Sequence, residues 1–387
     1  MRKIQVVVAV TMLLVFACKP QEKIVIEKEI IQKEMAGHKK PKNVIFMVGD
    51  GMGLTQITAA MISNGYRLNF ERFHSVGFHK SYSYDDLITD SAAGATAFSI
   101  GQKSYNAAIG VNKDTVAIRT LTEEAILLGY KTGVVVTSTI VHATPASFIA
   151  HNRHRNNYEE IAEDVANCKA DILIGGGKKY FDRRKTDELN LVEKMKKDGY
   201  KVESFLDIDP EKATIPSGIK YALFTADDDP LPVAQGRTYL EPMTMATIKA
   251  LDNTEKGFFL VVEGSQIDWG GHANNKDYVI TELLDFDKTI GKVLDYIDAN
   301  GETLLVITAD HETGGMAINP GSNSDSLSIS FATTHHSGTL IPVFAAGPGA
   351  ELFQGIYENT SIYDKIRKAL GWKEENQRII LDDRGTK

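Results

Sequence analysis

The stretch Asn43-Val-Ile-Phe-Met-Val-Gly-Asp-Gly-Met-Gly53 decides the fold. Five apolar residues, 44–48, are followed at once by Gly49, Asp50 and Gly51. A short apolar run that ends at glycine is typical of a buried strand. A side chain directly after such a strand lies at the carboxyl edge of a parallel sheet, where ligands bind. Asp50 is therefore a candidate site residue, although an aspartate between glycines could equally stabilise a turn.

The same pattern recurs along the chain. Short apolar runs alternate with segments of helical periodicity, as in βαβ units. The expected strands are residues 44–48, 133–137, 171–174, 221–224, 258–262, 303–308 and 341–345. The expected helices are residues 54–64, 91–102, 120–128, 158–168, 278–299 and 362–370. Because nothing between them resembles an interdomain linker, the sequence predicts one α/β domain over residues 43–375.

A second informative stretch is Ile88-Thr-Asp-Ser-Ala-Ala-Gly-Ala-Thr96, in which Ser91 opens a run of small, helix-compatible residues. The pattern places the Ser91 hydroxyl at a helix N-terminus. There, free backbone N–H groups and the helix dipole favour a bound anion and a serine alkoxide. An ordinary capped helix has the same signature, so this stretch alone leaves nucleophile and cap open.

Acids and histidines follow several of the expected strands. Since the carboxyl ends of parallel strands meet at one edge, we expect these side chains to converge. Close carboxylates raise each other's pKa values, and cations relieve that repulsion. Carboxylate and imidazole without thiolate suit zinc together with a harder ion such as magnesium. The residues in question are Asp50, His142, Thr144, Glu263, Asp268, His272, Asp310 and His311.

The segment Asp268-Trp-Gly-Gly-His272 places an acid and a histidine four residues apart, with two glycines between them. We interpret it as a tight loop that directs both side chains at one ion. Asp310 and His311, directly after an expected strand, would present adjacent ligands as the chain turns. Each of these residues, taken singly, could instead be a solvated loop residue or a helix cap.

The N-terminal segment differs in character from the rest. Arg2 and Lys3 precede an apolar run over residues 6–17, which predicts a signal peptide at 1–17 and an exported protein of the periplasm or cell envelope. Val15-Phe-Ala-Cys18 resembles a bacterial lipobox, so Cys18 is expected to carry a lipid anchor to the membrane, with ordinary signal cleavage as the alternative. Residues 18–42 are interpreted as a charged tether, and residues 376–387 as a C-terminal tail.

Charge and cysteine content narrow the partners. The chain has 43 Lys and Arg against 51 Asp and Glu, a formal charge of −8. Removing residues 1–17 deletes Arg2 and Lys3 and no acid, so the charge becomes −8 − 2 = −10. An acidic chain without a basic cluster argues against nucleic acid as a specific partner. Lipidation of Cys18 would leave Cys168 without a partner, so no disulfide is expected.

Over residues 43–372 the chain resembles the alkaline phosphatases. Residues 88–96 agree at every position with the nucleophile signature of that family. Further matching segments occur in the family's order. They are residues 43–53, His142-Ala-Thr-Pro-Ala146, His151-x-x-x-Arg155-x-x-Tyr158, Glu263-Gly-Ser-Gln-Ile-Asp268, Asp310-His-Glu-Thr-Gly-Gly315 and His336-Ser-Gly-x-x-Ile-Pro-Val343.

The resemblance implies a three-layer α/β sandwich with a central, mostly parallel sheet, usually assembled as a homodimer. It implies hydrolysis of small phosphate monoesters through a phosphoserine intermediate on Ser91, with Arg155 binding two phosphate oxygens. Asp268, His272 and His336 would hold a first zinc, which binds the leaving-group oxygen. Asp50, Asp310 and His311 would hold a second zinc beside Ser91. Asp50 would also join Thr144 and Glu263 at a third, magnesium-type site.

Four positions are less certain from the resemblance. His142 stands where some members of the family carry aspartate, and Trp269 stands where some carry lysine or histidine, so both are possible supporting residues around the site. Asp90 is expected to anchor the turn or to contact Arg155. His335 adjoins His336 and could exchange roles with it.

Three other functions compete with this interpretation. A Ser-His-Asp hydrolase lacks support, since no Gly-x-Ser-x-Gly elbow frames Ser91. A metal-dependent phosphodiesterase or sulfatase and a non-enzymatic phosphate-binding lipoprotein are the remaining alternatives.

Overall fold

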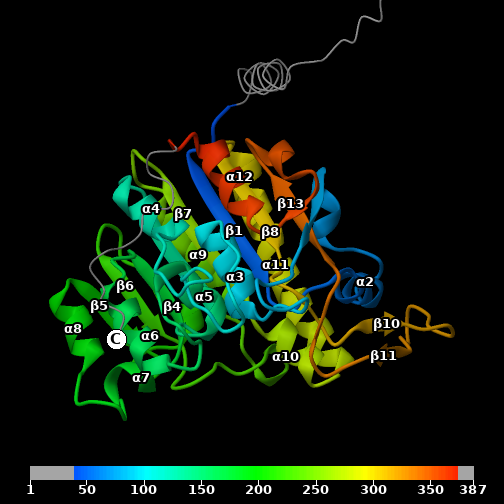
Figure 1. The fold of residues 1–387 in the computed structure, drawn as a ribbon, viewed down its shortest axis with the longest axis horizontal. Helices are drawn as coiled ribbons and strands as arrows, with labels where there is room; N and C mark the ends of the chain where they lie inside the picture. Colours follow the sequence, from blue (N-terminus) through cyan, green and yellow to red (C-terminus); the bar gives the residue numbers. More distant parts are fainter. Residues whose placement is uncertain (1–38, 374–387) are drawn as a thin grey trace, which may run out of the picture. The chain divides into compact units, whose positions relative to one another are not determined.

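A ten-stranded sheet forms the centre of the computed structural model, which describes residues 39–373 (Figure 1). Its strand order is β14-β2-β13-β8-β1-β7-β3-β4-β6-β5. Strand β13 runs antiparallel to both of its neighbours, and all the other pairs are parallel. The strands are β1 (Asn43–Gly49), β2 (Ser75–Lys80), β3 (Lys131–Thr139), β4 (Ile172–Gly176), β5 (Tyr200–Ser204), β6 (Lys220–Phe224), β7 (Phe258–Gly264), β8 (Thr303–Thr308), β13 (Leu340–Ala346) and β14 (Gly355–Glu358).

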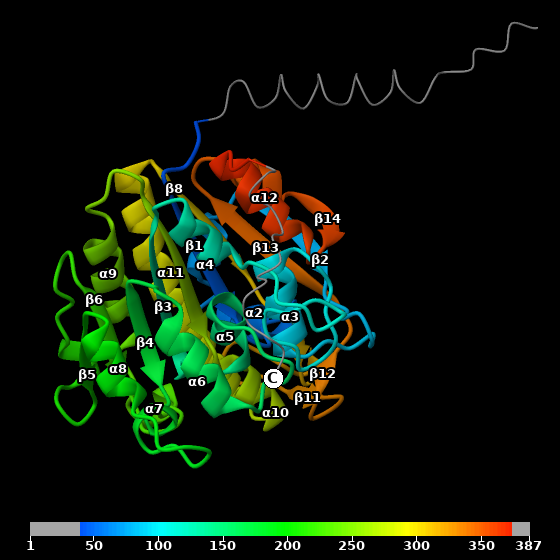
Figure 2. The same cartoon turned by 60° about the vertical axis from the view of Figure 1, so that its left-hand side comes forward.

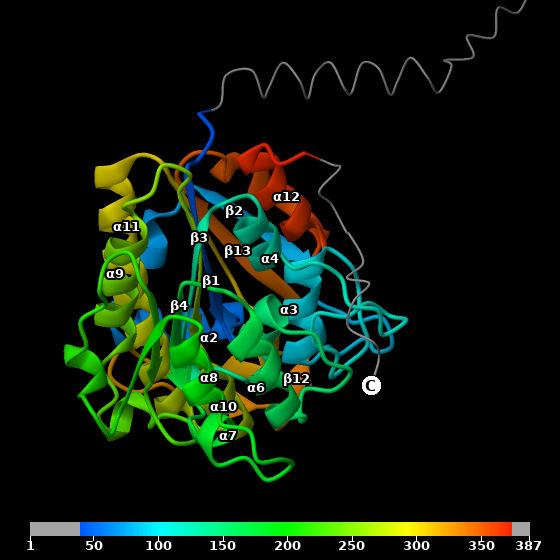
Figure 3. The same ribbon diagram turned by 90° about the vertical axis from the view of Figure 1, so that its left-hand side faces the viewer.

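Helices cover both faces of the sheet. In Figure 3, α9 and α11 lie on one side of the strands, and α3 and α12 lie on the other. The helices are α2 (Leu54–Ser63), α3 (Ser91–Ile100), α4 (Leu121–Leu127), α5 (Ala143–Ile149), α6 (Tyr158–Asn167), α7 (Lys179–Asp182), α8 (Leu191–Lys197), α9 (Leu240–Leu251), α10 (Gln266–His272), α11 (Lys276–Asn300) and α12 (Ser361–Leu370). Short 3-10 turns lie at η1 (Asn69–Arg72), η2 (Pro210–Lys212), η3 (Val233–Gln235) and η4 (Ala350–Phe353).

Alternation along β1 builds the two cores. Phe46 and Val48 pack with α3, α5 and α12 on one face, and Ile45 and Met47 pack with α2, α9 and α11 on the other. Both faces of the strand are buried, which explains its unbroken apolar run. The predicted architecture, a mostly parallel sheet between two helical layers, is confirmed (Figure 2).

Each strand and helix expected from the sequence overlaps an observed one. The elements that were not predicted include β2, β5, β14, α9 and two small antiparallel pairs. These pairs are β9 (Glu312–Thr313) with β12 (His336–Ser337), and β10 (Met316–Ile318) with β11 (Ile329–Phe331).

The register brings the carboxyl ends of the central strands to one level. Val48 of β1 lies opposite both Glu263 of β7 and Thr308 of β8. Asp50, Glu263 and Asp310 therefore gather at one edge of the sheet, the lower edge in Figure 1, where α10 also lies.

Three predictions fall outside the described residues: the signal peptide at 1–17, the lipidated Cys18 and the tail at 376–387. Most of the expected tether, residues 18–42, lies outside them as well. Within residues 39–373, no helix combines the length and apolar character needed to cross a membrane. Residues 40–373 belong to one compact unit, and Cys168 is a free thiol there.

Candidate active site

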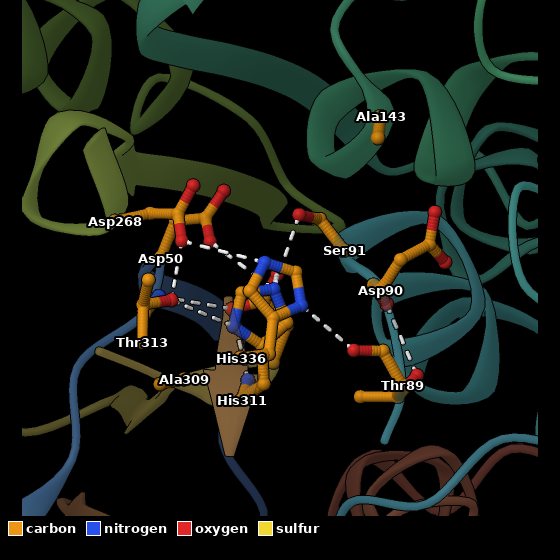
Figure 4. A network of polar contacts seen from close by, with 12 residues as sticks. Asp50, Thr89, Asp90, Ser91, Ala143, Asp268, Ala309, His311, Thr313 and His336 are labelled. Carbon is orange, nitrogen blue, oxygen red and sulfur yellow. Dashed lines mark hydrogen bonds and ion pairs between the residues drawn. The ribbon is translucent and has the colours of Figure 1, made fainter. Parts of the chain in front are cut away.

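Ser91 is the first residue of α3, and its side chain is buried. The cap of this helix is Asp90, whose Oδ1 accepts a hydrogen bond from the Ala93 amide at 2.9 Å. Because Asp90 fills the capping role, the Ser91 hydroxyl is free for other contacts. Its Oγ lies 3.2 Å from Nε2 of His311 (Figure 4).

Three oxygen atoms from different residues lie close to Nε2 of His311. Oδ2 of Asp310 lies 3.2 Å from it and Oδ1 of Asp50 lies 3.6 Å from it, in addition to Ser91 Oγ. The other ring nitrogen, Nδ1, faces Oγ1 of Thr313 at 3.3 Å. A serine and two carboxylates thus approach the same nitrogen, as ligands around one cation would.

A second group consists of Asp268, His272 and His336. His272 Nε2 lies 3.3 Å from Asp268 Oδ2, His336 Nε2 lies 3.6 Å from Asp268 Oδ1, and the two Nε2 atoms lie 3.2 Å apart. The Nδ1 atoms contact backbone carbonyls, of Thr334 at 2.6 Å and of Thr89 at 2.8 Å. Those carbonyls can only accept, so each Nδ1 carries the proton and each Nε2 lone pair can bind a metal.

The loop predicted between Asp268 and His272 is wrong, because both residues lie on helix α10. A spacing of four places them on the same helix face. The intervening glycines serve close packing: a Cβ at Gly270 would lie 2.6 Å from the amide nitrogen of Val279 in α11, and one at Gly271 would lie 2.8 Å from Thr313 Cβ. Glycine is therefore needed at these two positions because neighbouring atoms lie close to them. The chain does not turn there, since both glycines lie within α10.

A third group lies deeper. Ligand atoms of Asp50, His142 and Glu263 lie within 4.8 Å of one another. The expected third-site residue Thr144 is on α5, where it is fully buried. Among residues 39–373, several buried atoms around this point have no hydrogen-bond partner: both carboxylate oxygens of Asp50, Glu263 Oε1, Thr144 Oγ1 and His142 Nδ1.

The observed grouping differs from the expected ligand sets in two respects. Asp268 lies within ligand distance of Asp50 and His311, so its carboxylate faces the second group as well as the first. His142, expected only to support the site, belongs to the third group.

The electrostatics of the cluster call for cations. Burial, together with repulsion from Asp310 and Asp268, raises the pKa of Asp50 well above its usual value. Burial also raises the pKa of Glu263 to about 8. A hydrogen bond with Asp268 raises the pKa of His272 to about 9, whereas burial lowers that of His336 to about 4. Buried carboxylates that lack partners are costly unless an ion compensates them, so the donor set fits bound metal ions.

Arg155 lies beside the cluster and reaches the residues around Ser91. Its Nη1 donates to Asp90 Oδ2 at 3.0 Å, which is the contact expected from the sequence. Its Nη2 lies 3.3 Å from Nε2 of His142, whose pKa is lowered to about 3 by burial. The ring of Trp269 packs edge-on against His142, with centroids 6.1 Å apart. His335 is exposed, and His336 is the one whose ring enters the site.

Sequence reasoning missed two residues: Thr313 contacts the candidate ligands, and Glu312 holds the segment that follows them. Thr313 Oγ1 donates to Asp268 Oδ1 and contacts His311, so it touches both histidine groups. Buried Glu312 accepts hydrogen bonds from Gln56 at 2.5 Å and from the amides of Gly315 and Met316 at 3.1 Å. Both lie inside the quoted segment Asp310–Gly315, but only the tertiary contacts reveal their roles.

Comparison with known proteins agrees with this geometry. The sequence matches the alkaline phosphatase family over residues 41–328. Alkaline phosphatase 4 of Bacillus subtilis (strain 168) is 32% identical over an alignment 437 positions long, which covers 88% of this chain and 92% of that protein. Alkaline phosphatase 3 of the same organism is 38% identical over 306 residues, 74% of this chain and 64% of that protein, which is less than two thirds of its length.

Solved structures give the same result. The alkaline phosphatase of the Antarctic bacterium TAB5 is 41% identical, with a TM-score of 0.80 over 87% of this chain and 99% of that chain. A variant of that protein, in which one histidine is replaced by aspartate, is described with magnesium bound in its M3 site. The family match over most of the sequence and the similarity to these relatives show that this chain belongs to the alkaline phosphatase family.

Proposed function

We propose that this protein hydrolyses phosphate monoesters to an alcohol and inorganic phosphate, with Ser91 as the nucleophile that becomes phosphorylated. The observation that carries the proposal is the convergence of Ser91 Oγ, Asp310 Oδ2 and Asp50 Oδ1 on one nitrogen of His311. In a Ser-His-Asp triad the acid contacts the ring nitrogen opposite the serine. Here both acids and the serine contact the same nitrogen, an arrangement suited to metal ligands and unsuited to a histidine base.

The three groups of residues would hold three ions. Asp268, His272 and His336 would bind one zinc; Asp50, Asp310 and His311 would bind a second. Asp50, Glu263 and Thr144 would bind magnesium, with the His142 ring at the same place. When bound, such ions neutralise charge on the attacking and leaving oxygens of an in-line displacement.

The chain's own residues perform the remaining tasks. Ser91 Oγ forms a bond to phosphorus as the ester oxygen departs, and water then displaces Ser91 and releases inorganic phosphate. The positive end of the α3 helix dipole would stabilise negative charge at Ser91, the first residue of that helix. Arg155, fixed by Asp90, offers a planar fork for two phosphate oxygens.

The test combines one substitution with metal removal. Wild type, Ser91→Ala and the control Ser99→Ala would be assayed with p-nitrophenyl phosphate, and zinc and magnesium contents would be measured before and after chelation. Ser99 is also buried in α3, but its hydroxyl donates to the Thr96 carbonyl within the same helix. We expect Ser91→Ala to lose activity while it keeps its metal, and Ser99→Ala to stay active. Full activity of Ser91→Ala, or activity that survives chelation without bound zinc, would refute the proposal.

We also propose that the protein is exported, anchored through a lipid on Cys18 and homodimeric. The support is the basic, apolar and cysteine pattern of residues 2–18 and the family to which the chain belongs. Detergent-phase partitioning of wild type and Cys18→Ala tests the anchor, and sedimentation equilibrium tests the dimer. Unchanged partitioning of Cys18→Ala, or a monomer at micromolar concentration, would contradict the respective proposal.

A further inference from the structure

A buried histidine outside the ligand groups lies directly behind one of them. His79 is on β2, and its side chain is completely buried. Its Nε2 lies 2.9 Å from the carbonyl oxygen of Ala309, the residue that precedes Asp310. Its ring packs edge-on against Phe98 of α3, with centroids 5.3 Å apart. His79 thus contacts both the strand end that carries Asp310 and His311 and the helix that begins with Ser91.

The Ala309 carbonyl needs such a partner because the sheet ends there. Pairing of β8 with β13 extends only to Ile307, opposite Phe344. Because the two strands are antiparallel, the chain beyond Ile307 faces the residues of β13 that precede Phe344. One of these is Pro342, which has no amide hydrogen to donate. The Thr308 hydroxyl donates to the Pro342 carbonyl at 2.9 Å instead. The chain then leaves the sheet and enters the site, and His79 supplies the hydrogen bond that a neighbouring strand would otherwise give to Ala309.

The chemistry of this contact is defined. A carbonyl only accepts, so Nε2 of His79 carries the proton that it donates to Ala309. Burial lowers the pKa of His79 to about 4. Of the nearby charged groups, Lys103 lowers this pKa further and Asp310 raises it. The imidazole is therefore neutral at ordinary pH, and it gives the strand end a directed donor without adding charge behind Asp310.

We propose that His79 is a positioning residue, which holds Asp310 and His311 at the distance from Ser91 that metal binding requires. It does so through its hydrogen bond to Ala309 and its contact with Phe98. This inference rests on the proposed function, since it concerns the ligand pair next to the nucleophile. Groups that hydrogen-bond a metal ligand directly typically change metal affinity by about 10- to 100-fold, and His79 acts through the residue before the ligand pair, so we expect the lower end of this range.

The test compares donor and donor-free side chains. His79→Phe keeps an aromatic ring against Phe98 but lacks the donor, and His79→Gln offers an amide N–H at a similar reach. Zinc dissociation would be followed by competition with a chromogenic chelator, and kcat and KM would be measured at saturating zinc. We expect His79→Phe to bind its weaker zinc about 10-fold less tightly. We also expect its kcat to fall while its KM changes less. We expect His79→Gln to recover most of the zinc affinity.

A control separates positioning from general loss of stability. Asn43 is equally buried at the opposite, amino end of the sheet, where it contacts Thr303 Oγ1 at 3.0 Å and the Phe258 amide at 3.2 Å. Asn43→Ala is expected to lower the melting temperature without changing zinc affinity. If His79→Phe does not fold, the smaller His79→Leu gives the donor-free comparison.

Three results would overturn the inference: wild-type zinc affinity in the donor-free variants, Gln as poor as Phe, or an equal loss of zinc in Asn43→Ala. Repeating the zinc measurement in a Ser91→Ala background keeps this test independent of turnover. A protein that binds zinc through His79-dependent geometry but hydrolyses no ester would contradict only the proposed function.

Discussion

Replacing Asp90 by asparagine should loosen Arg155 while leaving α3 in place. Asp90 accepts three hydrogen bonds: from the Ala93 amide at 2.9 Å, and from the Ala107 amide and Arg155 Nη1 at 3.0 Å. Asparagine is as good an N-cap as aspartate, so the bond to Ala93 survives. The amide has one oxygen and no charge, so the anchor of Arg155 is weakened.

The structure allows an estimate of the size of this effect. A hydrogen bond between charged groups is worth about 1.5–3 kcal/mol when shielded. Both side chains are 20% exposed, so solvent screening reduces the contribution to about 1–1.5 kcal/mol. Since about 1.4 kcal/mol corresponds to a tenfold change, phosphate affinity should fall about five- to tenfold. Loss of the Asp90 charge acts in the opposite direction, but a bidentate grip depends on the orientation of the guanidinium, and we expect orientation to dominate.

The assay is inhibition of p-nitrophenyl phosphate hydrolysis by inorganic phosphate. Asp90→Asn should raise the inhibition constant five- to tenfold at unchanged zinc content, and kcat should rise if product release limits turnover. Asp298→Asn removes a similar charge from an exposed pair with Arg72 and serves as the control. An inhibition constant in Asp90→Asn that is unchanged, or lower, at wild-type zinc content would refute the reasoning.

Three further predictions follow from other contacts. Thr313→Val removes the hydroxyl between Asp268 and His311 and should weaken zinc binding about 10- to 100-fold in a chelator competition. Thr313→Ser keeps the hydroxyl and should bind zinc like wild type, so an equal loss in both variants would exclude the hydroxyl as the cause. Trp269→Lys adds a cation beside His142 and should lower the inhibition constant of phosphate, so an unchanged constant would count against the idea. Burial raises the pKa of Cys168 to about 12, above its unfolded value, so this group's stabilising contribution is complete below about pH 8.5 and declines as pH rises toward 12. Between pH 9 and 10 the free energy of unfolding of wild type should therefore fall by roughly 1 kcal/mol more than that of Cys168→Ala in urea denaturation, and parallel pH profiles would contradict this.

The sheet and its reactive edge could be predicted because the relevant signals are local. The apolar run of β1 and the polar residue directly after it are adjacent in sequence, and parallel pairing then fixes the edge to which Asp50, Glu263 and Asp310 belong. The N-terminus of α3 at Ser91 is equally local, since Asp90 and the small residues after it define a capped helix.

Features that depend on tertiary contact could not be obtained in this way. The two glycines of α10 indicated a turn, whereas their true constraint is contact with Val279 and Thr313, which no local pattern encodes. The strand β2, Ser-Val-Gly-Phe-His-Lys, alternates between buried and exposed residues, but a glycine and a histidine at its buried positions hide the apolar signal. The buried role of His79 depends on β13 lying between β2 and β8.

Under the proposed function, the contacts made by the Nδ1 atoms of the histidine rings would couple the geometry of the metal ligands to that of Ser91. His336 Nδ1 contacts the carbonyl of Thr89, which belongs to the turn that leads through Asp90 into Ser91. In the proposed mechanism, that turn would orient a ligand of the leaving-group zinc and would place Ser91 on the attacking side. A shift of the turn would move both together, which preserves the in-line relation between attacking and leaving oxygens that phosphoryl transfer requires. The proposed mechanism thus gives a physical reason for a hydrogen-bonded Asp90–Ser91 turn at this edge of the sheet, with the His336 ring bound to its backbone.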